Sequence, residues 1–168
     1  MSVNPSEHFE KIIAGQLERI RKMKSEGGFT DYASLPEIVI GICGGDGIGP
    51  AITAEGERVL RNLLAKETGS GKIKFKKIDG LTIEKRAECR KAIPDDVLAE
   101  LKACDVILKG PTTTPKAGDK WPNIESANVA MRKELDLFAN VRPVKIPAAG
   151  IDWVFFRENT EGSYAVGS

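Results

Sequence analysis

Along most of the chain, short apolar runs alternate with longer stretches in which apolar residues recur every three or four positions. The run at 37–43 is β-branched and almost wholly apolar, which is typical of a strand buried on both faces of a sheet. Similar strand patterns follow at 72–79 and 105–110, and helical patterns separate them at 50–66, 83–91 and 94–103. This alternation predicts an α/β fold with a mostly parallel sheet and flanking helices.

The first 35 residues predict a separate helical extension with a linker. Asn4 and Pro5 are typical of a helix start, and apolar residues then recur at helical spacing from Phe9 to Met23. The helix is expected to stop at Gly27. Because its charges are mixed rather than basic, docking against the body of the protein or a partner subunit is favoured over a membrane-surface or calmodulin-like role.

The composition excludes several classes of protein. Lys and Arg number 25 against 24 Asp and Glu, so the balance of charge does not favour nucleic acid or an anionic membrane as the main partner. The three cysteines form no CxxC pair and are odd in number, which argues against a disulfide framework or a zinc site. Without a signal pattern or an apolar run of about 18 residues, the sequence predicts a soluble cytoplasmic protein with reduced thiols.

A glycine-rich loop at 44–50 follows the first predicted strand. It partly resembles the dinucleotide fingerprint, in which glycines let backbone N–H groups approach a pyrophosphate at a helix N-terminus. However, Pro50 stands where the third glycine of that fingerprint should be, and no acidic residue at the expected spacing stands out as a ribose partner. A purely structural tight turn is therefore the favoured interpretation.

Groups that bind anions are concentrated in the second half of the chain. Ser126 and Asn128 fall in the first turn of a predicted helix, where free backbone N–H groups attract carboxylates, and Arg132 lies one turn later on the same face. Arg142 and Arg157 fall in later strand-like segments, and each guanidinium can pair bidentately with one carboxylate. From spacing alone, Arg132 could equally decorate a solvated helix face, with Ser126 as a simple cap.

Three motifs bear a family resemblance: KGPTTTP at 109–115, SANVAMRKELDLFANVRP at 126–143 and FRENTEGSYA at 156–165. In this order they resemble the isocitrate and isopropylmalate dehydrogenases, and DGIGP at 46–50 is typical of that family's first loop. The resemblance runs from about residue 36 to the end. It implies the fold of that family, which is not a true Rossmann fold, with residues 36–138 as the N-terminal part of the large α/β domain and 139–168 as the start of the small domain.

The resemblance also implies roles for individual residues. Substrate-contacting positions of the family match Ser126 and Asn128, and its carboxylate-binding arginines match Arg132, Arg142 and Arg157.

Four further positions match the catalytic and cofactor side of the family's cleft. Tyr164 matches the catalytic tyrosine, which would protonate the enol left after decarboxylation. Lys109, Thr113 and Thr114 match positions that line the substrate and nicotinamide side. Without the motifs, Tyr164 would be interpreted as a partly buried aromatic near a chain end. The other three would be interpreted as a strand end followed by a threonine-rich turn.

The implied activity is the oxidative decarboxylation of isocitrate to 2-oxoglutarate with NAD or NADP and with Mg²⁺ or Mn²⁺, in a homodimer. The spacing of Ser126 and Asn128 favours isocitrate over isopropylmalate, for which the family carries apolar residues there. Isopropylmalate, homoisocitrate and tartrate remain the alternative substrates. Two departures from the family pattern are Ala51, where a glutamate usually follows DGIGP, and a longer loop that contains Trp121.

The same resemblance implies that some parts of the enzyme lie beyond residue 168. The metal-binding aspartates, the second-subunit lysine and the segment that holds the adenosine half of the cofactor are expected there. We therefore expect the chain alone to be inactive, with sheet edges that a C-terminal half would pair. The competing hypothesis is a noncatalytic fragment that acts as a binding or assembly module.

Overall fold

The computed structural model describes residues 4–25, 28 and 30–161. These residues divide into two compact units, each treated by itself below. The first holds the described parts of Met1–Asp31 and Leu137–Ser168, and the second is Tyr32–Asp136. The assignment of residues to a large and a small domain stays a prediction.

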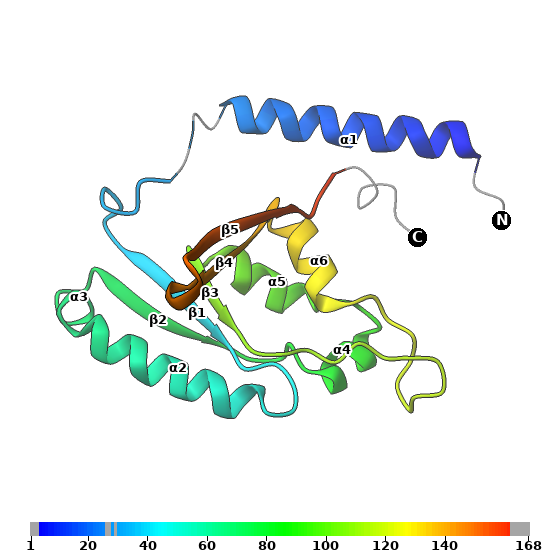
Figure 1. Ribbon diagram of the computed structural model, residues 1–168. Helices are drawn as coiled ribbons and strands as arrows, with labels where there is room; N and C mark the ends of the chain where they lie inside the picture. Colours follow the sequence, from blue (N-terminus) through cyan, green and yellow to red (C-terminus); the bar gives the residue numbers. More distant parts are fainter. Residues whose placement is uncertain (1–3, 26–27, 29, 162–168) are drawn as a thin grey trace. The chain divides into compact units, whose positions relative to one another are not determined.

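The second unit is built on a parallel three-stranded sheet (Figure 1). Its strands are β1 (Ile38–Cys43), β2 (Ile73–Ile78) and β3 (Val106–Lys109), in the order β2-β1-β3. The last residue of β1, Cys43, pairs with Ile78 of β2 and Lys109 of β3, so the carboxyl ends of all three strands are level. The predicted α/β class with a parallel sheet and flanking helices is confirmed.

Alternate residues of β1 bury their side chains on opposite faces of the sheet, as expected for a central parallel strand. Ile40 and Ile42 pack with Ile73 in a cluster that includes Leu108. The helices α2 (Gly49–Leu63) and α3 (Ala65–Gly69) follow β1, and Leu64 between them joins this cluster. The sequence predicted one continuous helix here, and the structure instead has a short second helix after Leu64.

The other face of the sheet holds the larger core cluster. It is formed with α4 (Ile83–Cys89), α5 (Asp95–Lys102) and α6 (Ala127–Glu134), which Figure 1 shows on the side of the sheet away from α2. Cys43, Leu101 and Ala127 are almost completely buried in it. Because α6 is anchored here through Ala127 and Met131, its N-terminus is fixed relative to the strand ends.

The first unit contains a helix and an antiparallel hairpin. The helix α1 (Pro5–Ser25) buries none of its described residues, and Arg19 forms an ion pair with Glu161. The hairpin consists of β4 (Ala139–Ile146), the short 3-10 helix η1 (Pro147–Ala149) and β5 (Ile151–Glu158). Within the described residues, no helix is both long enough and apolar enough to cross a membrane.

Candidate functional site

The loops that follow β1 and β3 meet at the carboxyl edge of the parallel sheet. The chain passes from β1 to β2 on one side and then returns to β3 on the other side of β1. Such a reversal of strand order opens a crevice at the carboxyl ends of the strands on either side of it, here β1 and β3, and open α/β sheets bind ligands in such crevices. Lys109 is the last residue of β3 and therefore lies at this switch point.

The glycine loop after β1 is packed against the loop after β3 at very close range. Gly45 has a left-handed φ of 70°, and a Cβ there would lie 2.1 Å from the carbonyl oxygen of Pro111. The N–H groups of Asp46 and Gly49 donate to Pro111 and Asp46 carbonyls. These amides are already used inside the protein, which agrees with a structural tight turn rather than a pyrophosphate cradle.

Gly110 should tolerate no side chain, because a Cβ there would lie 2.0 Å from the carbonyl oxygen of Gly44. We expect Gly110→Ala to lower the free energy of unfolding by about 3 kcal/mol, the upper end of the usual cost of overpacking. Gly69→Ala is the matched control, because nothing lies within 4 Å of a Cβ at that helical position. Urea denaturation of both variants tests this expectation, and equal stabilities would contradict the close packing.

The carboxylate of Asp46 ties three segments of the site together. Its Oδ1 accepts a hydrogen bond from the backbone N–H of Ile83 at 2.8 Å, and its Oδ2 accepts one from the N–H of Thr113 at 2.7 Å. The start of α4, the glycine loop and the threonine loop at 110–115 are therefore held by one side chain. The threonine loop is ordered before any ligand arrives.

Lys109, Thr112 and Asn128 form a line of polar groups at the switch point. The Lys109 ammonium donates to the Gly110 carbonyl at 2.5 Å and to the Thr112 hydroxyl at 3.4 Å. The Thr112 hydroxyl in turn donates to the Asn128 Oδ1 at a long 3.5 Å. Burial lowers the pKa of Lys109, and repulsion from Arg86 adds to this, while Cys43 and Asp46 oppose it. A half-buried cation short of countercharge suits an anionic ligand.

The N-terminus of α6 presents further unused polar groups. Ser126 is the N-cap residue, but its side chain makes no capping hydrogen bond. The two charged residues that follow Arg132 form ion pairs: Lys133 pairs with Glu125, and Glu134 pairs with Lys102. Arg132, by contrast, is half-buried and forms no ion pair or hydrogen bond with any residue that the structure describes. Arg132 therefore differs from Lys133 and Glu134, which are exposed and paired, and its binding role stays a prediction.

Thr113 and Thr114 lie on the loop after β3, and both are exposed. The backbone of Thr113 is hydrogen-bonded on both sides, through its N–H to Asp46 and through its carbonyl to Arg86. The side chains of the two threonines therefore project from a fixed main chain.

The hairpin of the first unit carries the other two predicted arginines. Arg157 of β5 pairs with Asn140 of β4, and Arg142 lies two residues further along β4. Residues at this spacing share a face of a hairpin, so the two guanidinium groups project on the same side. The Arg142 Nε donates to the Asn140 Oδ1 at 3.0 Å. Tyr164 lies outside the described residues.

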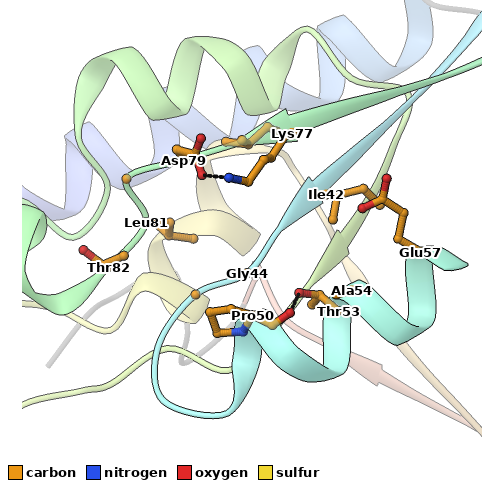
Figure 2. A pocket seen from close by; sticks show the side chains of 13 residues that line it. Ile42, Gly44, Pro50, Thr53, Ala54, Glu57, Lys77, Asp79, Leu81 and Thr82 are labelled. Carbon is orange, nitrogen blue, oxygen red and sulfur yellow. Dashed lines mark hydrogen bonds and ion pairs between the residues drawn. The ribbon is translucent and has the colours of Figure 1, made fainter.

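A small cavity of about 250 Å³ lies on the β2 side of the switch point (Figure 2). Its walls include Gly44 and Pro50 on one side and Lys77 and Asp79 on the other, and the last two form an ion pair at 3.0 Å. None of the site residues predicted from the sequence lines it. Its charged lining residues are Glu57, Lys77 and Asp79. Because two carboxylates stand against one ammonium group, this cavity offers no preference for an anion.

A divalent metal ion in a protein is held by several His, Cys, Asp or Glu side chains that lie close together. Among residues 4–25, 28 and 30–161, no group of three or more His, Cys, Asp and Glu side chains could hold a metal ion. The described residues therefore do not fit the divalent ion that the resemblance implies, and no step below is assigned to it.

The sequence pattern of the family described as Isocitrate/isopropylmalate dehydrogenase matches residues 39–167. The chain belongs to this family. It is 38% identical over 159 residues to the isocitrate dehydrogenase [NADP] of Caldococcus noboribetus, covering 86% of this chain and 36% of that protein. It is also 38% identical over 159 residues to the enzyme of the same name from Staphylococcus epidermidis, covering 88% of this chain and 35% of that protein.

A solved structure gives the same result for the fold. The isocitrate dehydrogenase from Methylococcus capsulatus matches 76% of this chain and 36% of its own length, with 30% identity and a TM-score of 0.55. The chain thus spans about a third of the length of the dehydrogenases it matches.

In this dehydrogenase chain, the structure brings Lys109 and Asn128 together through Thr112, a residue that the sequence analysis did not single out. Asp46 and Arg86 were missed as well. Asp46 belongs to the DGIGP motif, which was assigned only to a turn. Arg86 follows Ile83 by three residues and so falls on the buried face of α4, and a charged residue at such a position was the available signal.

Proposed function

We propose that this chain forms part of an isocitrate dehydrogenase and supplies most of its substrate-binding groups. The complete protein would oxidise isocitrate with NADP or NAD to 2-oxoglutarate, carbon dioxide and the reduced cofactor. NADP is the first choice, because both relatives named above carry it in their names. The observation that carries the proposal is the line of Lys109, Thr112 and Asn128 at the switch point. Arg132 lies one helical turn after Asn128 and forms no ion pair or hydrogen bond with any residue that the structure describes.

The chemistry assigns a task to each group. In the overall reaction the hydroxyl loses its proton to solvent while a hydride passes from the carbon that bears it to the nicotinamide, and a ketone forms. The carboxylate on the neighbouring carbon, which is β to that ketone, then leaves as carbon dioxide. The resulting enol then takes up a proton, a task that we assign to Tyr164. The side chains of Ser126 and Asn128, with Arg132, Arg142 and Arg157, would hold substrate carboxylates in place. These roles rest on the family motifs.

Lys109, Thr113 and Thr114 would line the substrate and nicotinamide side of the site. A lysine whose pKa is lowered by burial binds an anion best when no nearby carboxylate neutralises it, and the Lys109 ammonium forms no ion pair with the described residues. The resemblance implies Mg²⁺ or Mn²⁺, but the described residues include no group of side chains that could hold such an ion, so it is given no role in the reaction here.

We further propose a homodimer in the cytoplasm. The hairpin leaves large apolar side chains exposed on both faces, including Trp153 and Phe156, and monomeric proteins rarely expose such surfaces. The three cysteines are free, and burial raises the pKa of the Cys43 thiol, so this thiol stays protonated in a reducing compartment.

A substrate panel tests the substrate assignment. The chain completed by a C-terminal portion should show its highest kcat/KM with isocitrate when it is compared with isopropylmalate, homoisocitrate and tartrate. The hydroxyl of Ser126 and the amide of Asn128 favour a third carboxylate over a branched alkyl group, because a buried polar group left unpaired by an alkyl ligand costs about 1–3 kcal/mol. A higher kcat/KM with any of the other three acids would overturn the assignment.

A further inference from the structure

Arg86 is a fully buried cation at the centre of the second unit. Its relative exposure is 0%, and it lies on α4 next to the larger core cluster. Burial lowers its pKa, but an arginine in a protein remains protonated. Its guanidinium forms no ion pair with the described residues, and the Asp46 carboxylate acts on it only at longer range. A buried charge is costly, so its hydrogen bonds must compensate.

Each nitrogen of the guanidinium donates to the backbone carbonyl of a different segment. The Nε donates to Ala92 at 2.8 Å, the Nη1 to Thr113 at 2.7 Å and the Nη2 to Glu125 at 2.9 Å. One side chain thus joins the segment after α4, the threonine loop and the residue just before the N-cap of α6.

Two of these three carbonyls adjoin predicted site residues. Thr113 is itself a predicted site residue. Its carbonyl accepts a hydrogen bond from Arg86, and its N–H donates one to Asp46. Glu125 directly precedes Ser126, which begins α6 and leads to Asn128. The fork of Arg86 therefore sets the separation between the threonine loop and the first turn of α6.

We propose that Arg86 is a positioning residue, which holds the threonine loop and the start of α6 at the spacing that binds the substrate. It touches no reacting atom and acts through Thr113 and Ser126. This inference rests on the proposed function for the identity of the ligand. That Arg86 holds the two segments together does not depend on which ligand binds.

The planar fork explains why arginine occupies this position. Its donors lie on three nitrogens that diverge in one plane, so they can reach three separate carbonyls at once. A lysine at the same place would present all its donors from a single nitrogen. The substitution Arg86→Lys should keep the buried charge but release either the threonine loop or the start of α6.

The test uses the whole 168-residue chain with Arg86→Lys and two companion variants. Asp46→Asn should reproduce part of the effect, because an amide offers only one oxygen to the N–H groups of Ile83 and Thr113. Val97→Ala is the control, since Val97 is buried in the same core but contacts neither loop by a hydrogen bond. Hydrogen exchange and the melting temperature are measured on each chain, and isocitrate affinity is measured by calorimetric titration after a C-terminal portion has been added to each.

Arg86→Lys should speed hydrogen exchange at 110–116 and 124–128 by roughly tenfold, with 38–43 unchanged, and weaken isocitrate binding by about fivefold or more. Val97→Ala should lower the melting temperature and keep the affinity within about twofold of wild type. Unchanged exchange in the two loops would overturn the proposal, and so would an equal loss of affinity in Val97→Ala. If the wild-type chain completed by a C-terminal portion bound no isocitrate, the proposed function would fail, and the exchange result alone would decide whether Arg86 positions the loops.

Discussion

Replacing Lys109 by Met should lower kcat/KM for isocitrate at least about tenfold without lowering the stability of the fold. The ammonium group lies half-buried at the switch point beside Thr112 and Asn128, and no carboxylate of residues 4–25 or 30–161 pairs with it. A charge-assisted hydrogen bond to a substrate carboxylate is worth about 1.5–3 kcal/mol, which corresponds to at least about tenfold in kcat/KM.

The free energy of unfolding should not fall in Lys109→Met, because burial disfavours the charged form of Lys109 in the wild type. Its pKa in the folded chain lies below its ordinary value, so in the window between the two the unfolded chain binds more protons. The free energy of unfolding therefore rises with pH through that alkaline window in the wild type, and Lys109→Met should lack this rise. Affinity for isocitrate should fall over the same window as the folded Lys109 loses its proton.

Lys77→Met is the matched control for this experiment. Lys77 lies near the end of the neighbouring strand β2, is exposed and pairs with Asp79, so its replacement removes the same charge from a nearby place. Both variants are compared by steady-state kinetics in the completed protein and by thermal melting of the chain. If Lys77→Met lowered kcat/KM as much as Lys109→Met, the loss would come from the change in net charge and not from a specific contact. The site assignment would then be wrong.

The framework of the fold could be predicted from the sequence because it depends on local patterns. The run at 37–43 is apolar at nearly every position and formed β1, and helical periodicity after Pro5 matched α1. The periodic spacing of apolar residues, together with Gly or Pro at the element boundaries, was sufficient to predict these elements. The break between α2 and α3 at Leu64 was missed, since neither Gly nor Pro marks it.

The hydrogen bonds that shape the site could not be predicted in this way. Asp46 binds Ile83 and Thr113, which are 37 and 67 residues further along the chain. Arg86 reaches Thr113 and Glu125 over 27 and 39 residues. Such contacts are set by which loops meet at the carboxyl edge of the sheet, and no local pattern encodes that meeting. The family motifs named the groups that are expected to contact substrate, but they gave no information about these supporting side chains.

Isocitrate-dependent reduction of NADP should be absent with the 168-residue chain alone and should arise when a C-terminal portion is added. Two features support this expectation. Within the described residues no cluster could hold the metal ion, and several surfaces are apolar and uncovered. On α2 and the residue before it, Ile48, Ile52, Val59 and Leu63 fall within one face of the helix, and Ile48 and Leu63 are each 70% exposed.

These uncovered surfaces should also govern the behaviour of the chain alone. An apolar helix face of this kind and an edge strand such as β3 favour association with other chains. We expect the isolated chain to aggregate or self-associate in size-exclusion chromatography, and to do so less once the C-terminal portion is bound. A noncatalytic assembly module would bind a partner in the same way but would never yield turnover.

The most direct test mixes the purified chain with the separately produced C-terminal portion of a relative, such as the Caldococcus noboribetus enzyme, about a third of which this chain matches. NADPH formation is followed with isocitrate and Mg²⁺, and 2-oxoglutarate is identified as the product. The account predicts turnover by the mixture, none by either part alone, and at least a roughly tenfold loss when the chain carries Arg132→Ala. Turnover by the chain alone, above a substrate-free control and lost with Arg132→Ala, would contradict it, and so would a mixture that forms a stable complex without turnover.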